Sequence, residues 1–310
     1  MVGLLVGDAL GVPYEFHRPA QIPPRGQIEY DPPRGFERAH RGTPPGTWSD
    51  DGAQALCLLA SLLKKGRLDA DDFGRRLCNW RLKGYMAVDD RVFDIGITTA
   101  SALSAIEHGT PALEAGLAEA TDNGNGSLMR VLPLALWHAG SDVELVRDAE
   151  LQSCLTHRHR RSRVCCALYC LWARRMLAEA TDPWREAVDT VRRIYVDDAE
   201  ATEELECFVR PDDSPKGSGS GYVVDCLHSA RLALEEPGYE AVVRAAIALG
   251  HDTDTTACVA GGLAGLREGL SGIPERWRVG LRGRKLMRPL VNRLVEVDRS
   301  RASGGAASCD

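Results

Sequence analysis

Apolar and polar positions along the 310-residue chain recur mostly with the three-to-four-residue period of amphipathic α-helices. The segment "AQALCLLASLLKKG" (53–66) shows this clearly, because its apolar run ends in lysines and then Gly66, a typical helix stop. The same period predicts helices over 69–85, 98–109, 127–139, 142–155, 162–180, 183–195, 199–208, 221–235, 238–249, 255–269 and 283–298. Alternating strand patterns are nearly absent and aromatic residues make up 6% of the chain, so we expect an all-α protein.

Three segments lack the helical pattern. Residues 18–48 are rich in proline and predict a long surface loop, and "RPDDSPKGSGSG" (210–221) predicts a flexible turn. The tail "RASGGAASCD" (301–310) predicts disorder. Because no internal repeat or break in composition divides the rest, we expect a single compact multi-helix domain over 1–300, followed by the disordered tail 301–310.

Composition and charge narrow the class of protein. A net charge of −6 and a pI near 5.8 argue against nucleic-acid binding and against an anionic membrane surface. No apolar run approaches the roughly 20 residues of a membrane span, and "MVGLLVGDALGV" lacks the basic leader of a signal peptide. The cysteines are irregularly spaced without a CxxC pair, which indicates reduced thiols. We expect a cytoplasmic monomer.

Two acidic clusters, "GTWSDDG" (46–52) and "HDTDTT" (251–256), each precede an apolar helix. Either alone is explained by helix capping, because Ser, Thr and Asp accept hydrogen bonds from the free amides of a first turn. Capping uses one side chain, however, and a second carboxylate beside it adds repulsion unless a cation offsets it. Hard divalent cations prefer carboxylate, hydroxyl and water oxygens. Four aspartates at two helix starts therefore indicate a site for two metal ions.

Small residues follow the second cluster at a regular spacing. Ala257, Gly261 and Gly265 recur every four residues along the predicted helix 255–269. Each glycine costs about 1 kcal/mol in a helix interior relative to alanine. Close packing against another helix is the simplest compensation, so we expect this helix to be buried and to anchor the acidic cluster.

The segment "GDALGVPYEF" (7–16) has a further small-residue face and ends near Glu15, which has no local cationic partner. Glu15 is either a solvated helix-end residue or a carboxylate near the metals that polarises a water. In "DNGNGSLMRVLPLAL" (122–136), two Asn-Gly steps are typical of a tight turn, and glycines before a helix leave amides free for phosphate. "GSGSGY" (217–222) reads as a flexible turn or as a loop whose Tyr222 stacks on a ring. His157 and His159 are better explained as substrate contacts or surface residues than as metal ligands.

Taken together these motifs resemble the ADP-ribosylglycohydrolase family, which includes the dinitrogenase-reductase-activating glycohydrolases. The resemblance extends from about residue 3 to about residue 280. The motifs occur in the family's order: "GDALGVPYEF", "GTWSDDG", "FDIG" (93–96), "GNGSLMR" (124–130), "LTH" (155–157), "GYVVD" (221–225) and "GHDTDTTACVAGGLAG" (250–265).

The resemblance implies an all-α fold around a dinuclear metal site holding two divalent cations, Mg²⁺ or Mn²⁺. The implied metal ligands are Ser49, Asp50, Asp51, Asp252, Asp254 and Thr255. Glu15 matches a glutamate near the metals, and Asp94 matches an aspartate proposed to act in hydrolysis. The implied contacts to ADP-ribose are Asn125, Gly126, Ser127, His157 and Tyr222. The chain departs from the family's usual threonine at Ser49, from a polar residue at Gly52, and in its short N-terminus.

We therefore expect a metal-dependent hydrolase that cleaves the N- or O-glycosidic bond of an ADP-ribosylated protein or small molecule and releases ADP-ribose. One alternative is a non-catalytic regulatory protein that binds ADP-ribose on the same fold. Another is a DxDxT phosphatase, because "DTDTT" (252–256) matches that motif. Such a phosphatase needs a strand before the motif, whereas "AVVRAAIALG" (241–250) predicts a helix. The group linked to ADP-ribose is left open by the sequence.

Overall fold

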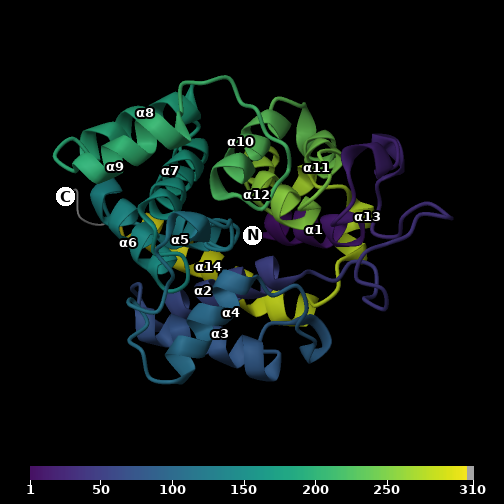
Figure 1. Cartoon of the computed structure of the whole chain (residues 1–310), viewed down its shortest axis with the longest axis horizontal. Coiled ribbons are helices and arrows are strands. Elements are labelled where there is room, and N and C mark those ends of the chain that lie inside the picture. The colour runs from purple at the N-terminus through teal and green to yellow at the C-terminus, as the bar shows by residue number, and fades with distance from the viewer. Residues whose placement is uncertain (306–310) are drawn as a thin grey trace.

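The computed structural model describes residues 1–305 and confirms the all-α prediction (Figure 1). Its α-helices are α1 (Val2–Gly11), α2 (Asp50–Lys65), α3 (Ala70–Lys83), α4 (Ile97–Glu107), α5 (Leu132–Trp137), α6 (Asp142–Cys154), α7 (Arg160–Leu177), α8 (Pro183–Ile194), α9 (Ala199–Glu203), α10 (Val223–Ala233), α11 (Gly238–Ala248), α12 (Thr253–Gly272), α13 (Glu275–Gly280) and α14 (Arg284–Gly305). Short 3₁₀ turns and one π-helical turn, Glu204–Val209, complete the elements. Over the described residues, β-structure is limited to two isolated bridges.

The N-terminal helix α1 packs along α12, which lies more than 200 residues later in the sequence (Figure 1). A Cβ added at Gly7 would lie 2.0 Å from the carbonyl oxygen of Ala257, and one added at Gly11 would lie 2.3 Å from the Cα of Asp254. These distances are too short for any side chain, so the glycines allow the two backbones to touch. The expected close packing of the small-residue face of α12 is confirmed, and its partner is α1.

The other helices surround this pair in sequential groups. Figure 1 shows α6 to α9 together at one end of the molecule and α2, α3 and α4 along its lower edge, with α14 against α2. Helix α2 begins at the N-cap Ser49 and ends at Gly66, whose φ of 66° gives the left-handed C-cap that the sequence predicts. The first turn of α12 is buried, as is the first turn of α2. Both acidic helix starts therefore lie in the interior.

One predicted helix is too long at its start. The pattern predicts a helix over 127–139, whereas α5 covers only Leu132–Trp137. The preceding residues form turns, because the Asn125 N–H donates to the carbonyl of Gly221 instead of entering a helical ladder. Pro133 then occupies the first turn of α5, where its missing N–H costs no hydrogen bond.

The two long loops are anchored to the core. The predicted loop 18–48 contains only short 3₁₀ turns, but its Ile28 and Tyr30 are buried, and the Tyr30 hydroxyl donates to the carbonyl of Trp277 at 3.0 Å. The turn 210–221 is tied at its end by Asp225 in α10, which accepts hydrogen bonds from the backbone and hydroxyl groups of Ser218 and Ser220.

The last helix extends further than expected. The predicted disordered tail begins at residue 301, whereas α14 continues to Gly305, and residues 306–310 of that prediction lie outside the described residues. No helix in the described part of the chain combines the length and the apolar character needed to cross a membrane. The described cysteines are all free thiols, in agreement with the cysteine spacing.

Candidate active site

The two acidic clusters, separated by about 200 residues in sequence, meet where α2 and α12 begin. Asp51 joins them, because one of its carboxylate oxygens accepts hydrogen bonds from the Ser49 hydroxyl at 3.1 Å and from the Thr255 hydroxyl at 3.3 Å. Asp50 lies one position earlier and accepts a hydrogen bond from the Gln54 side chain at 2.8 Å. The tertiary fold thus brings together the residues that the sequence analysis assigns to metal binding.

Several carboxylate oxygens in this cluster have no hydrogen-bond partner among the described residues. Both carboxylate oxygens of Asp254, and the second oxygen of Asp51, are buried without a hydrogen-bond partner among the residues that the structure describes. Burial raises the pKa of both carboxyl groups well above the usual value, and neighbouring carboxylates raise it further. An isolated carboxylate is costly to bury, and a divalent cation offers the charge and the coordination that these oxygens lack. The residues therefore fit a cation site.

Glu15 and Asp252 extend the cluster outward from Asp254. One oxygen from each of these three carboxylates can be chosen so that all lie within 4.8 Å of one another. Asp252 is held from both sides, since its carboxylate accepts from the Asn125 amide at 2.8 Å and its N–H donates to the carbonyl of Gly219 at 2.9 Å. Asn125 therefore acts on the acidic cluster directly.

Asp8 is a site residue that the sequence analysis missed. It is fully buried in α1, and its two carboxylate oxygens accept the backbone N–H groups of Ser49 at 2.8 Å and Gly52 at 2.7 Å. Burial raises the pKa of Asp8 to about 7 despite these two hydrogen bonds, which favour the charged form. Asp8 caps α2 from another helix and so fixes the position of the acidic turn 49–51. The available signal is a carboxylate inside the otherwise small and apolar helix "GLLVGDALG".

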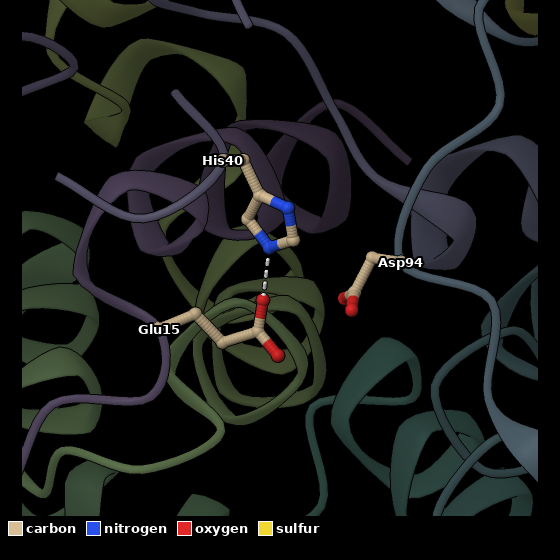
Figure 2. Close-up of side chains that lie close together, drawn as sticks. All are labelled: Glu15, His40 and Asp94. Carbon is tan, nitrogen blue, oxygen red and sulfur yellow. Dashed lines mark hydrogen bonds and ion pairs between the residues drawn. The ribbon is translucent and has the colours of Figure 1, made fainter. Parts of the chain in front are cut away.

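Glu15, His40 and Asp94 converge at the outer edge of the cluster, as Figure 2 shows. His40 comes from the proline-rich loop, and its Nε2 contacts a carboxylate oxygen of Glu15. Burial raises the pKa of Glu15 to about 11, and Asp94 is the carboxylate that adds most to this effect. Burial also lowers the pKa of His40. Sequence reasoning did not identify His40, because no motif surrounds it.

Asp94 reaches this position through an unusual backbone conformation. Its φ of 58° lies in the left-handed region, which aspartate tolerates better than most residues. The turn directs its carboxylate toward Glu15 and His40 just before α4 begins. Glu15 and Asp94, the two carboxylates that the family resemblance assigns to catalysis, therefore face the same space.

That space is a cavity of about 240 Å³. Its lining residues are Glu15, Asp50, Asp94, Gly96, Ile97, Thr98, Thr99, Gly124, Asn125, Gly126, Met129, His157, Gly221, Asp252 and Thr255. Carboxylates thus form one part of the wall, and glycines with His157 form another. Such a division suits a ligand with a hydroxyl-bearing part at the acidic side and an acceptor-rich part at the glycine side.

On the glycine side, the turn 124–126 lies against the imidazole of His157. A Cβ added at Gly126 would lie 2.8 Å from Cε1 of His157 and 3.2 Å from the hydroxyl oxygen of Thr99, so glycine is required there. His157 is buried, and its Nδ1 lies 2.8 Å from the hydroxyl oxygen of Thr156. Burial, and secondly the charge of Arg130, lower the pKa of His157 to about 3, so the ring is neutral.

Two residues implied as substrate contacts have side chains elsewhere. The Ser127 hydroxyl is fully buried and bonds with the hydroxyl of Ser153 at 2.8 Å, away from the cavity lining. The Tyr222 side chain is 38% exposed outside the lining, and its hydroxyl accepts from Arg161 at 3.0 Å. Ser127 therefore stabilises the turn from the core side. Tyr222 lies near the rim of the cavity, because its neighbour Gly221 is part of the lining.

The sequence also matches known proteins. The model of the ADP-ribosylglycohydrolase family matches residues 1–304. The chain is 30% identical over 288 residues to ADP-ribosylarginine hydrolase Tri1 from Serratia proteamaculans (strain 568), covering 89% of this chain and 72% of that protein. It is 28% identical over 284 residues to ADP-ribosyl-[dinitrogen reductase] glycohydrolase from Rhodospirillum rubrum, covering 89% of this chain and 86% of that protein.

A solved structure agrees with this assignment. A chain described as an ADP-ribosylglycohydrolase-related protein complex superposes with a TM-score of 0.76 at 30% sequence identity, and the match covers 95% of both chains. The fold is therefore shared along nearly the whole length. The DxDxT phosphatase alternative fails on the same evidence and on α11, since residues 238–248 before the motif form a helix where that mechanism needs a strand.

Proposed function

Because the chain belongs to the ADP-ribosylglycohydrolase family, we propose that it hydrolyses the glycosidic bond between ADP-ribose and a modified group. The observation that carries this proposal is the cavity wall, where Glu15 and Asp94 face the same space beside a buried carboxylate cluster. A carboxylate placed beside the anomeric carbon of a sugar is the group that glycoside hydrolysis requires.

The proposal includes two divalent cations, Mg²⁺ or Mn²⁺. The residues that would hold them are Ser49, Asp50, Asp51, Asp252, Asp254 and Thr255. The oxygens of Asp254 and Asp51 that have no hydrogen-bond partner among the described residues support this, because a cation would offset their buried charge. When bound, the cations would orient the ribose hydroxyls and lower the pKa of water.

The chain's own groups then divide the remaining work. Glu15 accepts the proton of the attacking water as the bond from the anomeric carbon to the leaving group breaks, and His40 fixes the direction of the Glu15 carboxylate. Asp94 lies beside the Glu15 carboxylate and His40 and is the alternative base. The neighbouring cation charge would lower the pKa of Glu15 from its raised value, so that the carboxylate is free to accept a proton.

We assign the glycine side of the cavity to the diphosphate and distal ribose. Gly124 and Gly126 present backbone without side chains on either side of Asn125, which allows a close approach of phosphate oxygens. The neutral imidazole of His157 supplies a hydrogen-bonding group beside that turn. Tyr222 at the rim is then placed toward the adenine end.

Arginine is the modified group that we favour. Two bacterial relatives carry names that specify an ADP-ribosylated arginine or an ADP-ribosylated dinitrogen reductase. Around the acidic edge of this cavity, Phe16 is 70% exposed beside His40, at 5.5 Å between ring centroids. An exposed aromatic ring next to carboxylates suits a planar cationic leaving group such as guanidinium. The substrate would be an ADP-ribosylated protein or a small conjugate of the same chemistry.

A panel of substrates tests the proposal. ADP-ribosylarginine, ADP-ribosylserine and an arginine-ADP-ribosylated protein are incubated with the chain in Mg²⁺, in Mn²⁺ or in chelator, and released ADP-ribose is measured. We expect release from the arginine conjugates, only with metal, and a rise in melting temperature with ADP-ribose. Tight binding of ADP-ribose without turnover of any conjugate would favour the non-catalytic regulatory alternative. The absence of both ADP-ribose binding and turnover would refute the proposal.

A further inference from the structure

Arg130 is a charged residue buried in the core behind the cavity. Its guanidinium is fully buried and, over the residues that the structure describes, forms no ion pair with a carboxylate. Instead it donates four hydrogen bonds, and their acceptors are Gln54 Oε1 at 2.9 Å, Gln152 Oε1 at 3.2 Å, the Gln152 carbonyl at 3.1 Å and Thr156 Oγ1 at 2.8 Å. A buried guanidinium satisfied only by neutral acceptors is costly, which indicates a role beyond packing.

Two of these acceptors in turn contact the candidate site. Gln54 donates from its amide nitrogen to Asp50 at 2.8 Å, and Thr156 lies 2.8 Å from Nδ1 of His157. Asp50 and His157 lie on the carboxylate and glycine sides of the cavity, respectively. Arg130 is therefore linked to both halves of the site by hydrogen bonds, through Gln54 to the carboxylate side and through Thr156 to the glycine side.

Arg130 cannot accept the Thr156 proton, and this constrains the hydrogen bond on the His157 side. Arginine can only donate, so Oγ1 of Thr156 accepts from Arg130 and its single proton is left for another acceptor. Within the described part of the chain, His157 Nδ1 is the acceptor in reach of that proton. Nδ1 is then unprotonated, and the neutral ring carries its proton on Nε2.

Nε2 of His157 faces the glycine turn. A Cβ added at Gly124 would lie 3.3 Å from this atom, so the atom lies directly beside the stretch of backbone that lines the cavity. A proton on Nε2 makes His157 a neutral donor toward an oxygen of a bound ligand. The opposite tautomer would make it an acceptor there, which would repel a phosphate or carbonyl oxygen.

The same reasoning applies to Gln54. Because Arg130 donates to Gln54 Oε1, the amide nitrogen of Gln54 must point the other way, toward Asp50. The amide then donates to one oxygen of Asp50 and leaves the rest of that carboxylate for a cation. With the amide reversed, two oxygens would oppose each other at this contact.

We propose that Arg130 is a positioning residue that orients both halves of the site: through Thr156 it holds His157 as an Nε2–H donor toward the ligand, and through Gln54 it orients Asp50. The ligand itself rests on the proposed function, whereas the tautomer of His157 and the orientation of Gln54 do not. The sequence offers a weak signal for Arg130, a charge directly before the apolar run "VLPLALW" (131–137).

The tautomer is measured directly by ¹⁵N NMR of histidine-labelled full-length protein, because protonated and unprotonated ring nitrogens resonate far apart. The His157 signals are assigned by their loss in His157→Gln. We expect a protonated Nε2 and an unprotonated Nδ1 in the parent and in Thr156→Ser, which keeps the hydroxyl. Thr156→Val removes the hydroxyl at nearly constant shape, and we expect His157 to shift to the other tautomer or to a mixture.

Binding assays on the same proteins follow the consequences. ADP-ribose affinity should fall about tenfold in Thr156→Val and stay within about twofold in Thr156→Ser, while Mn²⁺ affinity is unchanged in both. Gln54→Leu should have the opposite pattern: Mn²⁺ affinity should fall about tenfold, and the His157 tautomer should stay unchanged. Arg130→Lys keeps the charge but not the fork, and should produce both losses.

The outcomes separate the two claims. A protonated Nδ1 in the parent, or an unchanged tautomer in Thr156→Val, would overturn the inference whether or not ADP-ribose binds. If the parent shows the expected tautomer and Thr156→Val loses it, the Arg130–Thr156–His157 chain stands even if ADP-ribose does not bind, and only the proposed function fails. If Arg130→Lys does not fold, the Thr156 and Gln54 variants still decide the matter.

Discussion

At the scale of single residues, the candidate site depends on carboxylates that differ in what surrounds them. Asp254 has no hydrogen-bond partner among the described residues, whereas Asp8 has two backbone donors and Asp252 has an amide donor. Glu15 has the imidazole of His40. The environment of Asp254 favours a bound cation. At the other carboxylates, the hydrogen-bond donors fix the orientation of the side chain. Carboxylates of one site therefore serve different purposes.

We predict that Asp254→Asn weakens divalent cation binding and abolishes turnover. The amide oxygen keeps the shape but lacks the charge that attracts a dication, so affinity should fall by more than the roughly 10- to 100-fold that loss of an outer-shell partner costs. Calorimetric titration with Mn²⁺ measures the change. The matched control is the exposed Asp197→Asn, which should bind like the parent. Unchanged affinity in Asp254→Asn would show that this carboxylate is not a ligand.

We predict that Glu15→Gln separates binding from chemistry. The substitution keeps size and removes only the charge, so the fold and most of the ADP-ribose affinity should remain. Turnover should fall by roughly 100-fold or more, the usual scale for loss of a positioned acid or base. Steady-state kinetics with ADP-ribosylarginine measures this. A parent-like rate would make Glu15 a bystander, and Asp94→Asn would then be the variant expected to lose activity.

At the scale of elements, the contact between α1 and α12 positions the acidic cluster. Gly3, Gly7 and Gly11 each face the backbone of α12, and Thr253 at the start of α12 donates from its hydroxyl to the carbonyl of Gly11 at 2.8 Å. The cluster therefore sits where two helix backbones are in direct contact, with little freedom to shift. A cation site benefits from such rigidity because its ligands must keep a fixed spacing.

We predict that Gly7→Ala destabilises the protein and weakens cation binding together. The added Cβ would lie 2.0 Å from the carbonyl oxygen of Ala257, so the helices must separate, at a cost of about 1–3 kcal/mol or more. Urea unfolding measures the free energy, and Mn²⁺ titration measures the affinity. Gly26→Ala is the matched control, because no atom lies within 4 Å of its added Cβ. A loss of stability without weaker Mn²⁺ binding would argue that α1 does not position the site.

At the scale of the whole molecule, the buried carboxylates make folding, protonation and metal binding depend on one another. Burial raises the pKa of Glu15 to about 11 and that of Asp50 well above its usual value. A carboxyl whose pKa is raised by folding keeps its proton above an unfolded pKa of about 4, and the stability that it contributes is lost progressively as pH rises from that value through the folded pKa. In the absence of metal, these groups therefore increasingly oppose folding toward alkaline pH.

We predict that stabilisation by Mg²⁺ grows as pH rises from 6 to 8. Metal binding displaces the retained protons, so each proton released adds up to about tenfold in affinity per pH unit below the folded pKa. The difference in unfolding free energy between Mg²⁺ and chelator, measured in urea at each pH, cancels the contributions of groups remote from the metal. Asp254→Asn should flatten this dependence. A stabilisation that is constant or decreases with pH would contradict the prediction.

Most helices and most candidate site residues can be predicted from the sequence, and the features that cannot be predicted have a common cause. The period of apolar positions predicts most helices, and the stop at Gly66 is confirmed by its left-handed conformation. The predicted helix over 127–139 starts late because Asn125 pairs with Gly221, about a hundred residues away. The roles of His40 and Arg130 were not predicted for the same reason, because they depend on partners that the nearby sequence does not contain.

Local sequence is enough to predict the features whose causes lie within about one helical turn: helix period, caps, the acidic starts of α2 and α12, and the small-residue faces of α1 and α12. These follow from backbone hydrogen bonds and side-chain size, which neighbouring residues control. Long-range packing, in contrast, brings the two acidic starts together, makes α1 the partner of α12, and places Ser127 in the core while His157 lines the cavity. Those outcomes depend on how distant segments pack and on which buried polar groups find partners, and neither is written in any local stretch of the chain.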